Sequence, residues 1–235
     1  MEIRVIGTWN SKLSKNRRNT SYIINNNILI DCGPHTAESF INNGIKFSDI
    51  DTVLISHMHL DHYGGLPEFI WQRAFESTDK KIMIIGPDDI EKRTCNILNE
   101  YYTPDYFKKN IEFNKNFENI TIGNGKHSVK DYTYRLKIGN KTLFYTGDTS
   151  YSDEVIKNGY NSDIFIHEAT YPSTMEDIAV KYGHSTVNDA YKSFKSSRSK
   201  IFIPTHMSEL SLHEIAEIDD SDIMLPEENK KYVIP

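Results

Sequence analysis

The stretch that decides the fold is Ser56-His57-Met58-His59-Leu60-Asp61-His62-Tyr63-Gly64-Gly65-Leu66. The segment directly before it, residues 52–55 (Thr-Val-Leu-Ile), is short, apolar and β-branched, as expected for a buried parallel strand. The stretch therefore lies where a strand ends and the chain turns toward a helix, which is the end of an open α/β sheet where ligands bind. It contains four side chains that can bind a metal ion: His57, His59, Asp61 and His62.

The types and spacing of these four side chains favour a pair of metal ions. Neutral imidazole and carboxylate are ligands of zinc and of similar divalent ions. His57 and His59 are one residue apart, so in extended backbone their rings point the same way. Asp61 and His62 follow after a turn and can reach a second ion. Two-metal sites, with ions roughly 3.5–4 Å apart, recur in the hydrolysis of phosphoesters. The alternative is a solvated surface cluster of histidines, which the order H-x-H-x-D-H-x-G-G-L after an apolar strand disfavours.

Length and charge bound the classes of protein that are possible. The chain has 235 residues and a net charge of −6, and its pI is near 5.8. This length predicts a single domain over residues 1–235, because it is short for two. The acidic balance gives no overall electrostatic footprint for nucleic acid, although a local basic strip stays open. The two cysteines, Cys32 and Cys95, stand in unrelated contexts and favour a reducing compartment.

The start of the chain and its apolar runs favour a cytoplasmic protein without a membrane partner. Residues 2–7 read as a strand at once, and no basic segment with an apolar stretch precedes them, so we expect no signal peptide. No apolar run approaches the roughly 18 residues of a membrane span.

Apolar runs and turn signals predict an α/β order of elements. Strands are predicted at 2–7, 21–24, 28–31, 52–55, 82–85, 120–125, 132–138, 141–145, 163–166 and 201–204, with closing strands at 223–226 and 232–234. Helices are predicted at 36–43, 67–75, 88–101 and 186–197. The aromatic-rich segment 102–118 is less regular, and packing at the sheet edge is favoured over lining the site.

The order H-x-H-x-D-H resembles the signature of the metallo-β-lactamase-fold hydrolases. This resemblance implies an α/β (αββα) four-layer sandwich of two mixed sheets flanked by helices. Four motifs in the second half make the chain similar to the ribonuclease Z branch, the endonucleases that remove 3′ trailers from precursor tRNA, and to its phosphodiesterase relatives. These motifs are Gly147-Asp148-Thr149, His167-Glu168-Ala169-Thr170, Gly183-His184-Ser185-Thr186 and Thr205-His206.

The resemblance also implies a set of metal ligands. The first ion would be held by His57, His59, His127 and Asp148. The second ion would be held by Asp61, His62, Asp148 and His206. Zinc is the expected ion, with Mn²⁺ or Fe²⁺ as alternatives for the same donors. Asp31 would either orient a metal-ligating histidine or cap the helix that follows it, and both interpretations stay open.

Three residues carry the chemistry in this pattern. A hydroxide that bridges the ions would attack phosphorus, and Asp61 would accept its hydrogen bond or its proton. His184 would stabilise the phosphate or protonate the leaving oxygen, with Glu168 orienting its ring. The alternative for Glu168 and His184 is a helix-capping pair. His167 is expected to serve packing.

Two departures from ribonuclease Z affect the expected substrate. Members of that branch carry a basic arm between the third histidine ligand and the bridging aspartate, whereas here a predicted hairpin at 132–145 fills the interval from His127 to Asp148. The segment Thr205–Leu210 also lacks the Arg and Tyr that often follow this histidine in tRNA-processing members.

The expected function is therefore metal-dependent hydrolysis of a phosphodiester, with tRNA 3′-trailer cleavage as the strong alternative. A thioester or lactone hydrolase and a non-catalytic member of the fold are further alternatives. The expected partner is a phosphodiester substrate, RNA or tRNA included, and a homodimer is compatible with the resemblance.

Overall fold

The computed structural model describes residues 1–12, 14–77, 79–113 and 118–234. The chain forms two compact units, and each is described by itself. The first unit comprises Met1–Gly7, Asn16–Asn116 and Glu228–Pro235, and the second unit comprises Thr8–Lys15 and Phe117–Glu227. The prediction of one domain over residues 1–235 stays a prediction.

The first unit is built on a seven-stranded mixed sheet in the order β12-β1-β2-β3-β4-β5-β6. Its strands are β1 (Glu2–Gly7), β2 (Ser21–Ile24), β3 (Ile28–Ile30), β4 (Thr52–Leu54), β5 (Ile82–Ile85), β6 (Ile111–Phe113) and β12 (Lys231–Val233). Its α-helices are α1 (Thr36–Asn42), α2 (Leu60–Tyr63), α3 (Leu66–Glu76), α4 (Ile90–Glu100) and α5 (Asp105–Lys108), and a 3-10 helix spans Phe47–Asp49.

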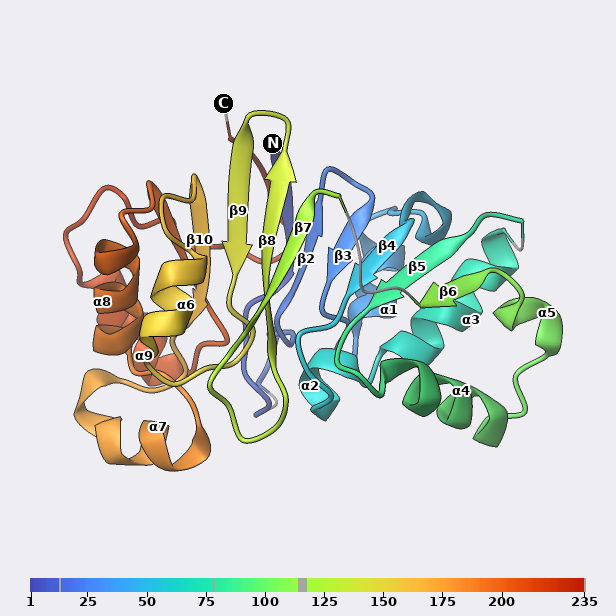
Figure 1. Cartoon of the computed structure of the whole chain (residues 1–235), viewed down its shortest axis with the longest axis horizontal. Helices are drawn as coiled ribbons and strands as arrows, with labels where there is room; N and C mark the ends of the chain where they lie inside the picture. Colours follow the sequence, from blue (N-terminus) through green and yellow to red (C-terminus); the bar gives the residue numbers. More distant parts are fainter. Residues whose placement is uncertain (13, 78, 114–117, 235) are drawn as a thin grey trace. The chain divides into compact units, whose positions relative to one another are not determined.

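Strands β3 to β6 run parallel. Strands β3, β4 and β5 are mostly buried and apolar, as expected for parallel strands that are covered on both faces. One cluster of buried side chains joins these strands to α1, α3 and α4, with an aromatic group of Phe40, Phe47 and Phe69 at its centre. Figure 1 shows these helices beside strands β3 to β6. Because β3 and β4 pair in register through Ile30 and Leu54, the residues after both strands emerge side by side.

The second unit is built on a five-stranded mixed sheet in the order β11-β10-β9-β8-β7. Its strands are β7 (Ile120–Asn124), β8 (Tyr132–Ile138), β9 (Lys141–Tyr145), β10 (Ile164–Glu168) and β11 (Ile201–Thr205). Its α-helices are α6 (Asp153–Asn158), α7 (Glu176–Tyr182), α8 (Val187–Ser197) and α9 (Glu209–Ala216), and a 3-10 helix spans Ser173–Met175.

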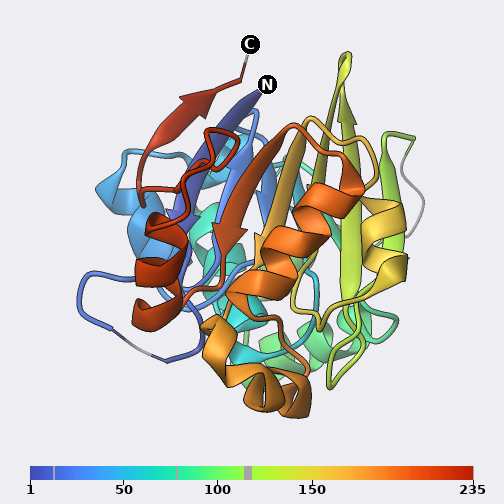
Figure 2. The same cartoon turned by 90° about the vertical axis from the view of Figure 1, so that its left-hand side faces the viewer.

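Helices α6, α8 and α9 cover one face of this second sheet, and α7 lies beyond the ends of its strands (Figure 2). The core beneath α8 is aromatic, with Phe194 packed on Phe165 and Phe202. Strands β9, β10 and β11 are parallel, so their carboxyl ends meet at one edge of the sheet. That edge carries the candidate site residues of this unit.

Two mixed sheets flanked by helices confirm the predicted fold class. The structure adds α2 inside the decisive stretch, and it adds α6, α7 and α9, none of which the apolar pattern predicted. The predicted strand at 223–226 is wrong, because Ile223 makes only an isolated bridge to Phe202. The segment 102–118 contains α5 and β6, and its residues 114–117 lie outside the described residues. Phe107 is buried against Trp71, which fits the packing interpretation.

Candidate metal centre

In the first unit the decisive stretch follows β4 and runs into α2. His59 keeps an extended backbone (φ −70°, ψ 153°) as the N-terminal cap of α2, so the turn predicted before Asp61 is a short helix. The segment packs tightly on the loop after β3, where the Cys32 amide donates to the His62 carbonyl at 2.7 Å. A Cβ on Gly33 would lie 2.0 Å from the Asp61 carbonyl oxygen, so only glycine allows this approach.

Asp31 is a fully buried carboxylate that organises this loop. Its Oδ1 accepts from the Ser56 amide at 2.7 Å, and its Oδ2 lies 2.7 Å from His62 Nδ1. Helix α1 has His35 at its N-terminal cap without a side-chain bond, so Asp31 does not cap it. Of the two interpretations left open by the sequence, the geometry matches the one in which Asp31 orients a histidine. Since an ionised carboxylate only accepts, Nδ1 of His62 carries the proton and Nε2 keeps its lone pair.

A hydroxyl makes a similar link to His57. The Ser56 Oγ donates to Asp31 Oδ2 at 2.8 Å and lies 3.1 Å from His57 Nδ1. The single proton of the hydroxyl is used on Asp31, so His57 Nδ1 donates to Ser56 and Nε2 keeps its lone pair. That Nε2 lies 2.9 Å from Nδ1 of His59.

The spacing of these donor atoms fits a cation. Bonds of about 2.0–2.1 Å in a tetrahedral arrangement place two ligand atoms about 3.3 Å apart. The His57–His59 nitrogen pair is separated by 2.9 Å, and His62 Nε2 lies 3.6 Å from Asp61 Oδ2. His57, Asp61 and His62 are buried, so their donors are held away from bulk water.

In the second unit, three adjacent parallel strands present the remaining motifs. Asp148 follows β9, Glu168 ends β10, and His206 follows β11 directly. The register pairs Glu168 with Thr205, which brings the end of β10 beside His206.

One residue of each unit's candidate group has an unusual backbone conformation. His206 and Asp31 have φ angles of 52° and 53°, in the left-handed region that non-glycine residues rarely adopt. Such backbone persists where the surroundings impose it, often at functional sites.

Asp148, His184 and His206 form a compact group that could hold a metal ion, with one donor atom of each within 4.8 Å of the others. His206 Nε2 lies 3.4 Å from Asp148 Oδ2, close to the ligand spacing given above. His184 Nδ1 lies 3.8 Å from the same oxygen, and the rings of His184 and His206 stack at 5.3 Å.

Glu168 is the hub of this group. Its Oε1 accepts from the Thr149 amide at 2.8 Å and contacts His184 Nδ1 at 2.9 Å, and its Oε2 accepts from the Ser185 amide at 3.1 Å. Although burial acts to raise its pKa, the charge and hydrogen bond of His184 lower the pKa of Glu168 from its ordinary value. The helix-capping alternative does not describe the pair, because α8 is capped by Thr186 and Asp189.

His127 follows β7 and is fixed by the backbone. Its Nδ1 donates to the Gly183 carbonyl at 2.7 Å, which leaves the Nε2 lone pair available. Burial lowers the pKa of His127 and favours the neutral ring that a metal needs. The loop around it is tied to the Asp148 loop, since the Lys126 amide donates to Thr149 Oγ1 at 2.9 Å.

Two supporting residues of this unit escaped the sequence reasoning. Asp131 is buried, and its Oδ1 accepts from the Asp148 amide at 3.2 Å. Thr170 stands in a quoted motif, but its role depends on long-range contacts. No local pattern marks Asp131, which precedes β8 in a polar stretch. His167 is buried and stacks on Phe165 at 5.6 Å, as expected for packing.

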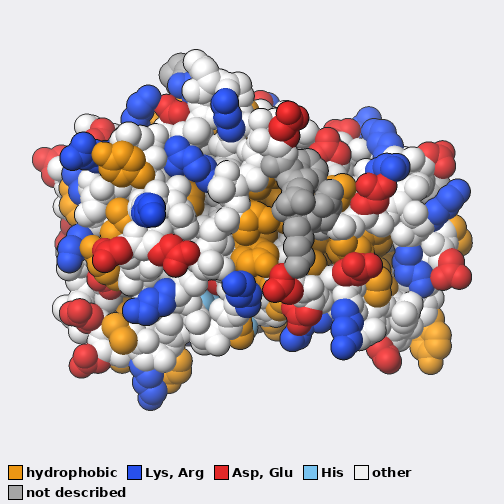
Figure 3. Space-filling view, viewed as in Figure 1, with side chains coloured by type: hydrophobic (Ala, Val, Ile, Leu, Met, Phe, Trp, Pro, Cys, Tyr) orange, Lys and Arg blue, Asp and Glu red, His pale blue; other side chains and the backbone are white. Residues whose placement is uncertain are grey.

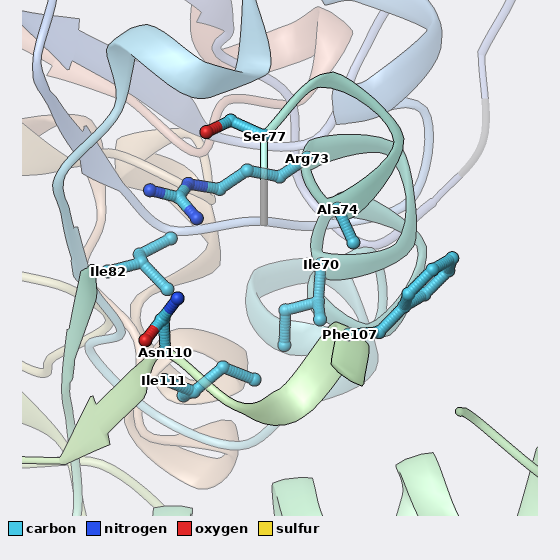
Figure 4. Close-up of a pocket in the computed structure, with 8 residues that line it drawn as sticks. All are labelled: Ile70, Arg73, Ala74, Ser77, Ile82, Phe107, Asn110 and Ile111. Atoms are coloured by element: carbon cyan, nitrogen blue, oxygen red, sulfur yellow. The ribbon is translucent and has the colours of Figure 1, made fainter. Parts of the chain in front are cut away.

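Two cavities of the first unit lie outside this ligand set. The one in Figure 4 is a volume of about 10 Å³ beside Arg73, room for about one water. The Arg73 guanidinium donates to the carbonyls of Ile50, Lys80 and Lys81, so it braces the backbone and does not form a ligand site. The second cavity, about 420 Å³, is lined by Met58, Leu60, Tyr63, Gly64, Pro67, Arg93, Asn96, Ile97 and Tyr101.

Among the described residues, every helix is too short or too polar to cross a membrane.

Comparisons with known proteins agree on the fold and the class of chemistry. The family model described as "Anti-Pycsar protein Apyc1" matches residues 1–211. The chain is 26% identical to the ribonuclease Z of Listeria monocytogenes over 271 residues, covering 88% of this chain and 89% of the relative. It is 25% identical to the ribonuclease Z of Methanothermobacter thermautotrophicus over 266 residues, covering 88% and 87%.

The chain is also similar in structure to the short form of human tRNase Z, with a TM-score of 0.83, 21% identity and full coverage of both chains. These findings confirm the ribonuclease Z-like resemblance and the prediction of a metal-dependent hydrolase of phosphodiester bonds.

Proposed function

The chain belongs to the Anti-Pycsar protein Apyc1 family. We propose the substrate class and the metal of this protein from its own residues. The protein is a hydrolase of small phosphodiesters that uses two divalent metal ions, with zinc expected and Mn²⁺ or Fe²⁺ as alternatives. One observation carries this proposal. Each of four proposed ligand histidines has Nδ1 bound to an oxygen, and this leaves the Nε2 lone pair for a metal ion. The four are His57, His62, His127 and His206.

The assignment of ligands follows the family pattern. The first ion would be held by His57, His59, His127 and Asp148. The second ion would be held by Asp61, His62, Asp148 and His206. A carboxylate or hydroxyl behind a ligating imidazole is the usual support of such sites, and it is present behind His57, His62 and His206. When bound, the ions supply Lewis acidity and lower the pKa of water.

The roles of the other residues follow from their contacts. Asp61, held in α2 beside His62, is the carboxylate that receives a proton from the attacking water. His184 keeps Nδ1 on Glu168, so a proton on its Nε2 can be given to the leaving oxygen. Its side chain is 15% exposed, so the ring reaches solvent while its Nδ1 partner stays buried.

Three observations support a small substrate over tRNA. The interval from His127 to Asp148 is filled by strands β8 and β9 and a turn at Gly139, which leaves no room for an arm. The alignment with the Methanothermobacter enzyme runs over 266 residues although this chain has 235, so that relative carries additional segments. On the face that Figure 3 shows, Lys and Arg side chains are interspersed with Asp and Glu.

The 420 Å³ cavity supports the same view. Its volume lies in the range of small-molecule sites, roughly 300–1,000 Å³. Met58 and Leu60, which line it, are chain neighbours of His57, His59 and Asp61, so the cavity lies next to the stretch that carries these proposed ligands. Cleavage of tRNA 3′ trailers is the second candidate, because the curated relatives are ribonuclease Z enzymes. A homodimer and a cytoplasmic location stay predictions.

The test compares three substrates with metal-loaded protein: a chromogenic bis-aryl phosphodiester, a precursor tRNA with a 3′ trailer, and a thioester. Asp61→Ala is the variant, and Asp105→Ala, at a fully exposed aspartate of α5, is its matched control. We expect turnover of the phosphodiester alone, lost in Asp61→Ala and kept in Asp105→Ala. Cleavage of the tRNA at its trailer would favour the second candidate. Thioester turnover without phosphodiester turnover, or wild-type rates in Asp61→Ala, would overturn the proposal.

A further inference from the structure

Thr170 contacts both the buried carboxylate of Glu168 and the buried imidazole of His206. It lies two residues after β10, and it is 5% exposed. Its Oγ1 lies 2.5 Å from Glu168 Oε2 and 2.8 Å from His206 Nδ1. Its amide also donates to Glu168 Oε2 at 3.3 Å, so backbone and side chain hold Thr170 on the same carboxylate.

The protons in this chain of contacts can be assigned. Both carboxylate oxygens of Glu168 accept from backbone amides, Oε1 from Thr149 and Oε2 from Thr170 and Ser185, so the carboxylate is the acceptor in its contact with the Thr170 hydroxyl. The hydroxyl of Thr170 therefore donates its only proton to Glu168. Its oxygen then accepts from His206, which places the proton of that imidazole on Nδ1 and the lone pair on Nε2.

The first unit contains the same arrangement independently. There Asp31 contacts one histidine, His62, directly and reaches a second, His57, through the hydroxyl of Ser56. Glu168 likewise contacts His184 directly and reaches His206 through Thr170. In both units one buried carboxylate serves two histidines, and in both a hydroxyl extends its reach.

We infer that Thr170 is a positioning residue that relays the charge of Glu168 to His206 and holds the His206 ring with Nε2 ready for a metal ion. This inference rests on the proposed function, in which His206 binds the second ion. Through Glu168, Thr170 also links the proposed metal ligand His206 to the proposed proton donor His184, because Glu168 orients His184 as well. Loss of the hydroxyl should weaken metal binding while the bond between Glu168 and His184 remains.

The experiment measures metal affinity by competition with a chromogenic chelator, using Zn²⁺ and the full chain. Thr170→Val keeps the shape and removes the hydroxyl, and Thr170→Ser restores the hydroxyl. Thr133→Val is the matched control, since Thr133 is a buried threonine of β8 whose Oγ1 has no hydrogen-bond partner among the described residues. Thermal melting of the metal-free proteins shows that each variant folds.

We expect Thr170→Val to bind one of two ions about 10–100-fold more weakly, Thr170→Ser to stay within about threefold of wild type, and Thr133→Val to bind both ions as wild type does. Wild-type affinity in Thr170→Val would overturn the inference. Failure of the wild-type protein to bind two ions would instead overturn the proposed function.

A second measurement does not depend on any variant. Long-range ¹H–¹⁵N correlation spectra distinguish the two neutral tautomers of a histidine. We expect the proton of His206 on Nδ1 in the wild-type protein. A proton on Nε2 would overturn the inference that the Thr170 hydroxyl accepts a hydrogen bond from His206 Nδ1.

Discussion

Replacing Glu168 by glutamine removes one charge from the most connected buried side chain of the second unit. The amide of Gln keeps one oxygen, so one side of the hub must lose its acceptor. The milder orientation turns the NH₂ group toward the Thr149 amide and His184. His184 can change its tautomer and accept, but the Thr149 amide cannot. The opposite orientation would leave two amides, those of Thr170 and Ser185, without an acceptor.

The expected loss of stability follows from the milder orientation. One buried amide without an acceptor costs about 1–3 kcal/mol, and the remaining hydrogen bonds lose the gain of a charged acceptor, about 1 kcal/mol. The free energy of unfolding should therefore fall by about 2–4 kcal/mol, a large share of the roughly 5–15 kcal/mol of a native domain. The proton transfer through His184 should also slow by about 100-fold or more.

Urea unfolding of metal-free Glu168→Gln measures the first effect, and initial rates on the chromogenic phosphodiester measure the second. Glu214→Gln is the matched control, because Glu214 is only partly buried and accepts from the Ser173 amide at 2.8 Å and from its hydroxyl. We expect the control to lose less than about 1 kcal/mol. An unfolding free energy of Glu168→Gln within about 0.5 kcal/mol of wild type would show that the hub does not need the carboxylate, and the reasoning would fail.

Three further predictions concern Asp131, His167 and the metal ions. Asp131→Ala should weaken binding of an ion by about tenfold or more because the Asp148 amide loses its acceptor, whereas Asp131→Asn keeps an oxygen there; chelator competition on both variants decides this. Burial lowers the pKa of His167 in the folded protein from 6.5, so the unfolded chain binds the proton more readily and stability is present above pH 6.5 and lost as pH falls below it. His167→Gln should lose less stability than wild type between pH 7.5 and pH 5.5 in urea unfolding, and equal losses would contradict this. Treatment with a strong chelator should abolish phosphodiester turnover and lower the melting temperature, with both restored by added Zn²⁺; turnover that survives complete metal removal would speak against a metal-dependent reaction.

The strand at 52–55 and the histidines after it could be predicted, because these features depend on residues close together in the sequence. The apolar run at 52–55 predicts a strand, and the one-residue gap between His57 and His59 predicts that their rings meet, as the 2.9 Å contact shows.

In the second unit, the predicted hairpin at 132–145 is also present, as β8 and β9. The short helix α2 was not predictable in the same way, because four residues are too few to show a helical period.

The supporting contacts could not be predicted, since they join residues far apart in the sequence. Asp31 and His62 are 31 positions apart, and Thr170 and His206 are 36 apart. Each pair depends on two parallel strands that are neighbours in register, β3 with β4 and β10 with β11, and the first pair also depends on α2, which carries His62. Periodicity along the chain shows that a strand is buried but not which strand lies beside it.

The sequence by itself determined where most strands lie and the order in which candidate donor side chains occur, because strand propensity and side-chain alternation act over a few residues; the class of fold followed from the resemblance of its motifs to a known family. The tertiary structure alone indicates which ring nitrogen carries the proton in His57, His62 and His206. That depends on the buried carboxylates of Asp31 and Glu168 and on the hydroxyls of Ser56 and Thr170, which strand order brings to the same edge of each sheet. Burial gives these contacts their strength, because a charge or a hydrogen bond away from water is screened less than one at the surface.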